Sequence, residues 1–168
     1  PPEAVPPPAP VPLPEPRPLP YTIQVSSYPE HLRSHGIALD LRDKGDPAFT
    51  APTQVPGKGL LHRVFIGHFN QINQARAEAE QLKARNFRRA DIVVKPYALQ
   101  LGRSDSPLEL DHLETQLGRL GYLLYRLPDP DQPQMTRLLM GAYGTEPEAL
   151  PTAKALLEKG FKPKIVAR

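Results

Sequence analysis

The chain has 168 residues, a formal net charge of +3 and a hydrophobic fraction of 39%, so it is long enough for one globular domain or two small ones. Cysteine is absent, which excludes disulfide bonds, thiol catalysis and cysteine-ligated metals. The mild basic excess contains no concentrated Lys/Arg run, so it permits an anionic partner without requiring one. The sequence shows neither a signal peptide nor an apolar run long enough to cross a bilayer. Because it starts at Pro1 without a methionine, we expect a fragment whose targeting segment has been removed.

Residues 1–20 are dominated by proline, which occupies 11 of these positions. Proline has no backbone donor and cannot continue a helix or join the interior of a sheet. We therefore expect an extended, semi-rigid linker over residues 1–20. The alternative is a proline-motif ligand for a small adaptor domain.

Residues 21–96 carry patterns in the order strand, helix, strand, strand, helix, strand. Tyr21 to Ser26 alternates apolar and polar side chains, which places Gln24 and Ser26 on one face of a half-buried strand. Further strands are predicted at Ala48–Thr53, Leu60–Ile66 and Ile92–Val94. Helices are predicted from apolar stripes between Leu32 and Leu41, before Gly45, and between Ile72 and Leu82.

Residues 97–168 repeat this order, and only Lys95 and Pro96 separate the two halves. Strands are predicted at Tyr97–Gly102, Tyr122–Leu127, Met135–Gly141 and Lys164–Ala167, and helices within Leu108–Leu120 and Pro147–Lys159. Four positions in the first half match residues of the same or similar type 74 positions later in the second half. The pairs are Arg63 and Arg137, Gly67 and Gly141, Phe69 and Tyr143, and Phe87 and Phe161. We interpret this match as an internal duplication.

The order of elements predicts an α+β fold made of two tandem βαββαβ units of the RNP or ferredoxin-like type. Each unit is expected to be a four-stranded antiparallel sheet with two helices on one face. The other face then meets solvent or a ligand, with the first and third strands at its centre. On these bare faces we expect Gln24, Ser26, Arg63 and Phe65 in the first unit, and Gln100, Gly102, Arg137 and Leu139 in the second.

Two stretches of the first half resemble a known family. Tyr-x-Ile-Gln-Val-x-Ser-Tyr at Tyr21–Tyr28 and Arg-Val-Phe-Ile-Gly-x-Phe at Arg63–Phe69, followed by an alanine-rich helix, are similar to the SPOR (sporulation-related repeat) domain of bacterial envelope proteins. The resemblance implies a first SPOR-like repeat over residues 21–96 and a second, more divergent one over residues 97–168. It also implies binding of peptidoglycan, with a preference for glycan strands that amidases have stripped of their stem peptides.

The resemblance points to Gln24 and Ser27 as glycan contacts. Sugars present hydroxyl and acetamido groups that suit neutral amides and hydroxyls, and apolar faces that suit an aromatic ring. An arginine would pair with a muramyl carboxylate exposed by loss of the peptide, and Arg103 stands where the family has serine. The predicted glycan-binding residues are Gln24, Ser26, Ser27, Arg63, Phe65, Gln100, Arg103 and Arg137. The alternative is that they are ordinary solvated residues of the sheets.

Other constellations of polar residues are less specific. His31 and His35 are four residues apart and would share a helix face, but no third metal ligand is near in sequence. Gly57-Lys58-Gly59 lacks the spacing of a phosphate-binding loop, and Asp129 and Asp131 lack the glycine and distal glutamate of a calcium loop. No base is placed beside a serine nucleophile. We therefore predict no enzymatic activity, no metal and no cofactor.

The leading functional prediction is a non-catalytic peptidoglycan-binding module of the kind found in cell-division proteins. We expect it in the periplasm or cell envelope, tethered through an N-terminal anchor outside this chain or exported by a removed signal. Its expected partner is the glycan strand, with envelope proteins as further candidates. The alternative is a scaffold subunit of a larger envelope assembly. An RNA-recognition motif has the same topology, but only Phe65 offers a ring on the central strands, so no nucleic acid is expected.

Overall fold

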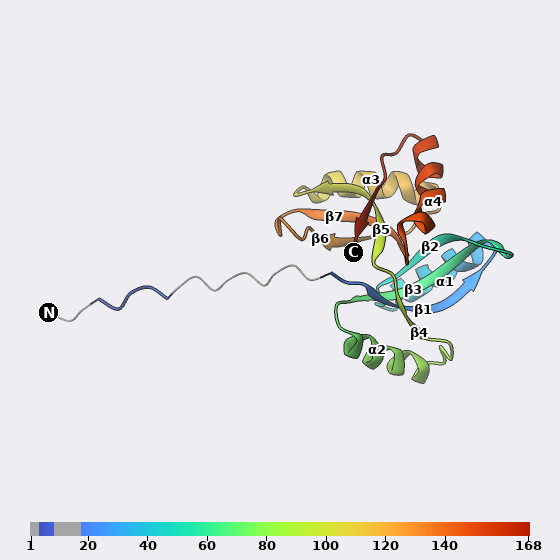
Figure 1. Ribbon diagram of the computed structural model, residues 1–168, viewed down its shortest axis with the longest axis horizontal. Coiled ribbons are helices and arrows are strands. Elements are labelled where there is room, and N and C mark those ends of the chain that lie inside the picture. The colour runs from blue at the N-terminus through green and yellow to red at the C-terminus, as the bar shows by residue number, and fades with distance from the viewer. Residues whose placement is uncertain (1–3, 9–17) are drawn as a thin grey trace.

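A computed structural model describes residues 4–8 and 18–168 of the chain (Figure 1). Within these residues the chain forms four helices and two four-stranded antiparallel sheets, arranged as two βαββαβ units. The α+β prediction is confirmed. Most of the linker expected over residues 1–20 lies outside the described residues, which omit 1–3 and 9–17.

Unit one follows the predicted order of strands and helices. Its elements are β1 (Tyr21–Tyr28), α1 (His31–Asp43), β2 (Ala48–Val55), β3 (Gly59–Phe69), α2 (Ile72–Ala84) and β4 (Asp91–Val94). The strands lie in the order β2-β3-β1-β4, so the first and third strands are central, as expected.

Unit two has the same topology. Its elements are β5 (Tyr97–Ser104), α3 (Pro107–Arg119), β6 (Leu124–Pro128), β7 (Thr136–Tyr143), α4 (Glu146–Glu158) and β8 (Lys164–Ala167). The strands lie in the order β6-β7-β5-β8. Pro151 lies inside α4, beyond the first helical turn where sequence reasoning expected it.

Each unit has a hydrophobic core between its sheet and its helices. In unit one this core joins Ile23 and Ile66 of the sheet to Leu41 of α1 and Leu82 of α2. The corresponding core of unit two is built from Leu99, Leu138, Met140, Leu117 and Leu156. These side chains recur with the periods of a strand and of a helix, which is why the sequence pattern identified them.

A β-bulge in β1 changes which residues share a face. Gln24 lies opposite Phe65, but two residues later Ser26 lies opposite Val64, whose side chain belongs to the helix-side core. The extra residue therefore turns Ser26 away from the face of Gln24 and brings Ser27 opposite Arg63. Strict alternation had placed Ser26 beside Gln24, and that expectation is wrong.

Unit two contains the same bulge. Gln100 lies opposite Leu139, and Gly102 lies opposite Leu138. A Cβ atom at Gly102 would come within 2.7 Å of Leu113 in α3, so this position points towards the helices. The predicted place of Gly102 on the helix-free face is corrected for the same reason.

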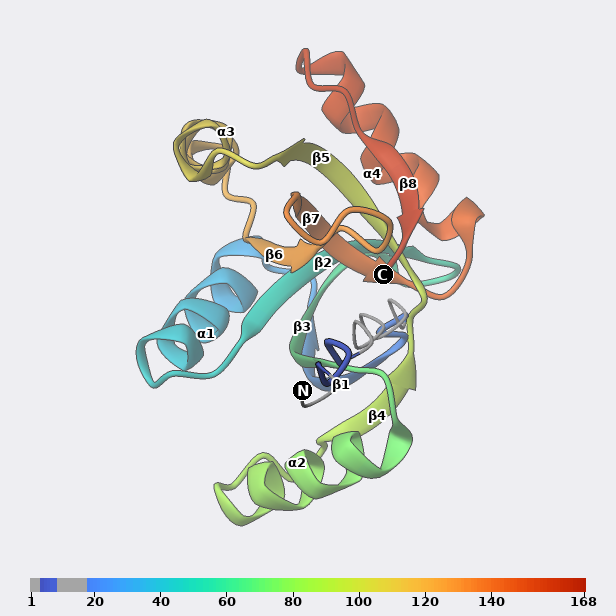
Figure 2. The same cartoon turned by 90° about the vertical axis from the view of Figure 1, so that its left-hand side faces the viewer.

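The helix-free faces of the two sheets pack on one another instead of facing solvent. Phe49, Ala51 and Phe65 of unit one form a buried cluster with Ala98, Tyr125, Leu127, Leu139 and Ala142 of unit two. Figure 2 shows β2 of unit one lying beside β6 and β7. We expected both helix-free faces to meet solvent or a ligand. That expectation is wrong for the apolar residues on these faces. Alanines at three positions of the cluster allow the two backbones to approach closely.

Hydrogen bonds along the seam between the units add to this packing. The Tyr143 hydroxyl donates to the Pro52 carbonyl at 3.0 Å, and the Thr152 hydroxyl donates to the same oxygen at 3.2 Å. On the other side of the seam, Arg42 donates to the Leu124 carbonyl at 2.5 Å. The two units consequently form one continuous body.

Candidate functional site

A polar hollow of about 300 Å³ runs along the second half of β1. Its walls are Gln24, Val25, Ser26, Ser27 and Tyr28 of β1, with Arg89 and Asp91 beside them. The hollow exists because β4 is short. It pairs only with Tyr21 to Gln24, so within the described residues no strand continues along that edge of β1 beyond Gln24. Backbone polar groups on that edge of β1 are then left for a ligand or solvent.

The hydroxyl groups of this hollow carry unused hydrogen-bonding capacity. Among the described residues, neither Ser26 Oγ nor Ser27 Oγ has a hydrogen-bond partner, although both atoms are buried. Burying a hydroxyl without a partner costs about 1–3 kcal/mol. Together with the half-buried amide of Gln24, these groups suit a ligand rich in hydroxyl and amide groups.

Arg89 and Asp91 are members of the hollow that sequence reasoning missed. Asp91 lies directly opposite Gln24 in the β1–β4 ladder, and Arg89 is exposed two residues before it. Sequence reasoning began the fourth strand at Ile92 and did not pair it with the first strand, so it did not identify Asp91 as a neighbour of Gln24. Arg89 adds a positive charge to an otherwise neutral set of donors.

Phe65 does not contribute a ring to any open surface. It is fully buried and packs on Phe49 with 5.4 Å between ring centroids. Arg63 is half-buried and lies opposite Ser27 across the β1–β3 ladder. Of the residues predicted in unit one, the structure therefore brings Gln24, Ser26 and Ser27 together and encloses Phe65 between the sheets.

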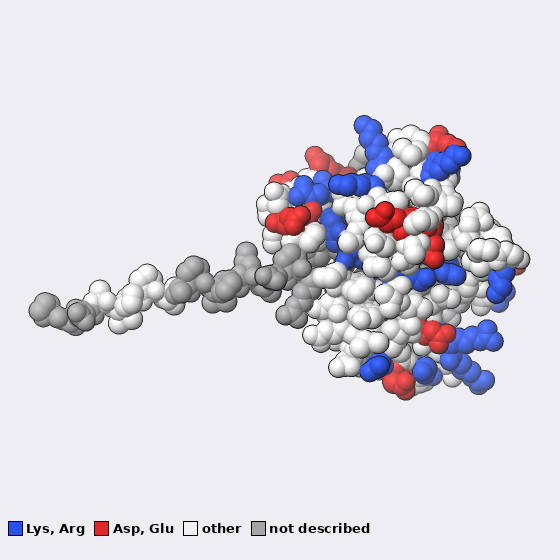
Figure 3. Space-filling view, in the orientation of Figure 1, with Lys and Arg blue, Asp and Glu red and all other residues white. Residues whose placement is uncertain are grey.

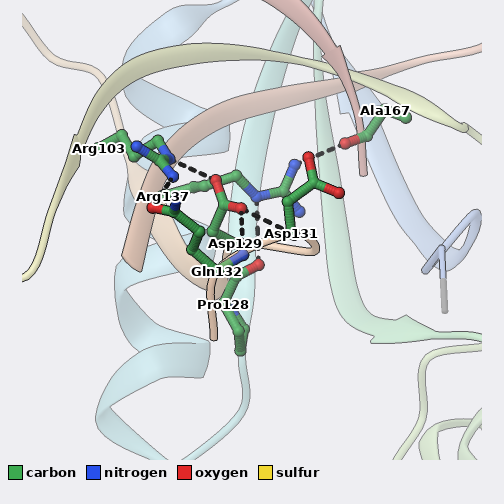
Figure 4. A network of polar contacts seen from close by, with 7 residues as sticks. All are labelled: Arg103, Pro128, Asp129, Asp131, Gln132, Arg137 and Ala167. Atoms are coloured by element: carbon green, nitrogen blue, oxygen red, sulfur yellow. Dashed lines mark hydrogen bonds and ion pairs between the residues drawn. The ribbon is translucent and has the colours of Figure 1, made fainter. Parts of the chain in front are cut away.

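The residues predicted in unit two surround a second polar hollow of about 380 Å³, which also includes Lys164 and Asp131. Gln100, Arg103 and Arg137 all line it. Arg103 is held by the turn between β6 and β7: it donates from Nε to Asp129 at 2.5 Å and from Nη2 to Gln132 at 2.8 Å (Figure 4).

Asp129 organises this turn. Its Oδ1 accepts from the backbone N–H groups of Asp131 and Gln132 at 2.9 and 3.0 Å, while its Oδ2 accepts from Arg103. The hydrogen bond from Arg103, followed by those from the backbone, lowers the pKa of Asp129. Three hydrogen bonds therefore hold the carboxylate within the turn, and Arg103 serves as its counter-charge.

Arg137 lies deeper and connects the same turn to β8. It donates from Nε to the Pro128 carbonyl at 3.2 Å and from Nη1 to the Ala167 carbonyl at 2.7 Å, and only 6% of its surface is exposed. Burial lowers the pKa of its guanidinium. Arg103 and Arg137, the two arginines of unit two predicted to bind glycan, thus make structural contacts that sequence reasoning did not foresee.

The histidines form a cluster at the seam instead of a metal site. The His31 ring lies 5.5 Å from that of His35 and 5.1 Å from that of His62, measured between centroids. His31 Nε2 is 2.8 Å from the Gly121 carbonyl oxygen of unit two. Burial lowers the pKa of both His35 and His62. No group of three or more His, Cys, Asp or Glu in the described part of the chain is placed to hold a metal ion.

Comparisons with known proteins agree with the geometry of unit one. No helix among the described residues is both long and apolar enough to span a bilayer. No curated protein and no solved structure matched the chain. The family model described as the SPOR domain matches residues 20–95, which are unit one with the residue before it. Over residues 20–95 the chain is therefore similar to the SPOR domain, a peptidoglycan-binding module.

Proposed function

We propose that the protein is a non-catalytic module that binds the glycan strands of peptidoglycan through the hollow along β1. The observation that carries this proposal is the grouping of Gln24, Ser26 and Ser27 beside the unpaired edge of a central strand, within the unit that matches the family. The hollow offers the amide of Gln24 and open backbone groups, with two buried serine hydroxyls beside them. These are the partners that hydroxyl and acetamido groups of a sugar require.

Charge in the same hollow supports a preference for glycan strands without stem peptides. Removing the peptide leaves a carboxylate on the muramyl sugar, and the exposed Arg89 guanidinium is available to pair with it. Asp91 in the same hollow would repel a misplaced carboxylate. A peptide-linked muramyl group carries a neutral amide instead, and so lacks this charge pairing.

Unit two has a different part in this proposal. Its helix-free face is occupied by the apolar residues of unit one, and Arg103 and Arg137 are engaged in its own turn. Unit two would then support unit one within the same chain, while glycan binding stays with unit one. We place the module in the periplasm or cell envelope, in a protein that acts in cell division and is tethered through the proline-rich linker.

Nucleic acid is a poorer partner for this molecule. Phe65, the ring that sequence reasoning offered for base stacking, is buried between the sheets. Figure 3 shows Lys and Arg interspersed with Asp and Glu over the face drawn, without a continuous basic stripe. Both observations favour a carbohydrate ligand.

Sedimentation with purified sacculi tests the proposal, with and without amidase digestion of the sacculi beforehand. We expect more protein to sediment after digestion, and the variant Gln24→Ala to bind about tenfold more weakly, because a lost hydrogen bond costs roughly 1 kcal/mol or more. Gln100→Ala is the matched control, since Gln100 occupies the corresponding register position of unit two. Equal loss in both variants, or no sedimentation at all, would contradict glycan binding by unit one.

A further inference from the structure

One corner of the helix-free face of unit two is not covered by unit one. Apolar residues of this face, including Leu139 and Ala142, pack on unit one, but the polar hollow of about 380 Å³ stays open beside them. We call this hollow the unit-two corner. Its polar side chains from the sheet are Gln100, Arg103, Arg137 and Lys164.

The register of three strands places these four side chains on the same face. Lys164 lies opposite Gln100 in the β5–β8 ladder, and Arg103 lies opposite Arg137 in the β5–β7 ladder. Directly opposite residues project to the same side of a sheet. Leu139, which is buried on the helix-free face, lies opposite Gln100 and two residues after Arg137. The four side chains therefore project together from the helix-free face.

The unit-two corner has an excess of positive charge. Like charges directly opposite each other destabilise a sheet, yet Arg103 and Arg137 form such a pair. Asp129 binds Arg103, and Figure 4 shows both arginines beside this aspartate. Asp131 also lines the hollow. With Lys164 included, three cationic side chains meet two carboxylates, so the corner attracts an anion.

Each of the three cations keeps an N–H donor open to a ligand. Lys164 is exposed and makes no hydrogen bond or ion pair with another described residue. Arg103 uses Nε and Nη2 in the turn, and 35% of its side chain is exposed. Nη2 of Arg137 has no hydrogen-bond partner among the described residues, and it is not one of the buried polar atoms that lack a partner. It therefore retains accessible surface.

The corresponding positions of unit one are less positive. Where unit two has Arg103, unit one has Ser27, and where unit two has Lys164, unit one has Asp91. Both exchanges occur at matching register positions, and both add positive charge to unit two. The unit-two corner consequently suits a more negative ligand than the sugar groups proposed for unit one.

We propose that the unit-two corner binds a phosphate ester. A phosphate group presents three strong acceptor oxygens, which matches donors that come from three neighbouring strands, whereas a carboxylate presents only two. Lysine and arginine are the side chains that bind phosphate most readily. The amide of Gln100 lies opposite Lys164, where it suits a hydroxyl group of the same ester. The phosphate belongs either to a soluble ester or to a lipid headgroup, and the site does not depend on glycan binding by unit one.

Titration of the full chain at constant ionic strength, followed by nuclear magnetic resonance, tests this site with glucose 1-phosphate and with glucose as its neutral counterpart. We expect glucose 1-phosphate to shift the signals of Gln100, Arg103 and Lys164. Glucose should bind at least about tenfold more weakly, because hydrogen bonds to a charged acceptor are roughly twice as strong as neutral ones. Equal binding of the two compounds would overturn the proposal.

Sedimentation with vesicles of phosphatidylglycerol distinguishes the two sources of phosphate. Binding to these vesicles without binding of glucose 1-phosphate assigns the site to a lipid headgroup, and the reverse result assigns it to a soluble ester. Binding of both probes assigns it to the phosphate group itself. Binding of neither probe would refute the site.

A pair of lysine variants separates the unit-two corner from diffuse surface charge. Lys164→Gln removes one charge from the corner, and Lys162→Gln removes the same charge from an exposed position that does not line it. We expect Lys164→Gln to weaken binding of the phosphate probe at least about tenfold, and Lys162→Gln to weaken it by less than about twofold. Equal losses would refute the site. Both variants should bind sacculi as the wild-type protein does, so failure of this site is distinct from failure of glycan binding along β1.

Discussion

Gly67 and Gly141 occupy corresponding positions in the two units, and each is required by a β-bulge. Between Tyr21 and Ile23 the β1–β3 ladder gains an extra residue on β3, and Gly67 there has φ of 84°. Gly141 occupies the equivalent place in unit two with φ of 73°. A Cβ atom at Gly141 would lie 2.6 Å from the ring of Tyr143. The recurrence therefore reflects a bulge whose first residue must be left-handed, with an aromatic ring packed on it.

Replacing Gly141 by alanine should lower the free energy of unfolding by about 2–4 kcal/mol, because a left-handed alanine costs about 1–2 kcal/mol and the clash with the Tyr143 ring adds to it. Gly118→Ala is the matched control. Gly118 lies in α3 with nothing within 4 Å of an added Cβ, so alanine should stabilise the protein by about 0.5–1 kcal/mol. Urea denaturation measures both changes, and two changes of the same sign would contradict the explanation.

His68 makes stability dependent on pH. Its ring is stacked between Phe49 and Tyr125, with centroid distances of 5.0 and 4.4 Å. Burial, and then the charges of Arg168 and Arg42, lower the pKa of His68 to about 3. The unfolded chain binds this proton at about pH 6.5. The contribution is therefore complete above pH 6.5 and is lost as the pH falls towards 3.

The melting temperature should consequently fall as the pH is lowered from about 6.5 to 3. His35 and His62, whose pKa values are also lowered, add smaller contributions to this fall. His68→Gln should reduce the slope of this dependence, because glutamine does not titrate. A slope that is the same in the wild-type protein and His68→Gln would show that His68 is protonated in the folded state.

At the scale of single elements, α4 is better capped at its N-terminus than the other helices. The Thr145 side chain accepts from the backbone N–H of Glu148, and the Glu148 carboxylate accepts from the N–H of Gly144 at 3.0 Å. This reciprocal arrangement resembles a capping box. None of the other described helices has a side-chain hydrogen bond from its N-cap residue. The cap holds α4 where Thr152 can donate across the seam to Pro52.

Thr145→Ala should therefore destabilise the protein by about 1 kcal/mol. Ser106→Ala at the N-cap of α3 is the comparison, because the Ser106 side chain makes no capping hydrogen bond, and we expect a change close to zero. Thermal unfolding of both variants measures the difference. Equal losses would show that the Thr145 hydrogen bond does not contribute to stability.

At the scale of the whole molecule, two small units are joined into one body by their sheets. A unit of about 75 residues buries little apolar surface by itself, and here the apolar cluster around Phe49 and Phe65 supplies additional burial to both. The same packing leaves the polar half of β1 outside the seam. The shape of the molecule therefore separates a stabilising surface from a candidate binding surface on one sheet.

Truncating Phe65 tests this coupling. Phe65→Ala should cost about 3–5 kcal/mol and should accelerate amide hydrogen exchange in β7 of unit two as well as in β3. Phe65→Leu retains most of the apolar volume and should cost clearly less. Unchanged exchange in β7 after Phe65→Ala, or two separate unfolding transitions in the wild-type protein, would mean that the units are not coupled.

Local patterns in the sequence were sufficient for the architecture and for part of the site. The useful patterns were the alternation in strands, the apolar stripes in helices and the recurring glycines, all of which depend on neighbours along the chain. They predicted both βαββαβ units and the place of Gln24 and Ser27 on a central strand. The signature residues around them predicted the SPOR domain that the comparison found.

Only the tertiary structure decided which surfaces stay open. Phe49 and Tyr125 lie on the outer strands and on the helix-free faces. Whether such residues form an exposed patch or a buried contact depends on whether another sheet covers them. The bulge that turns Ser26 inwards, the ion pair of Arg103 with Asp129 and the hydrogen bond from Arg137 to the Ala167 carbonyl also depend on residues far apart in sequence. Periodicity along a chain carries no information about such long-range contacts, because they follow from how the two sheets pack.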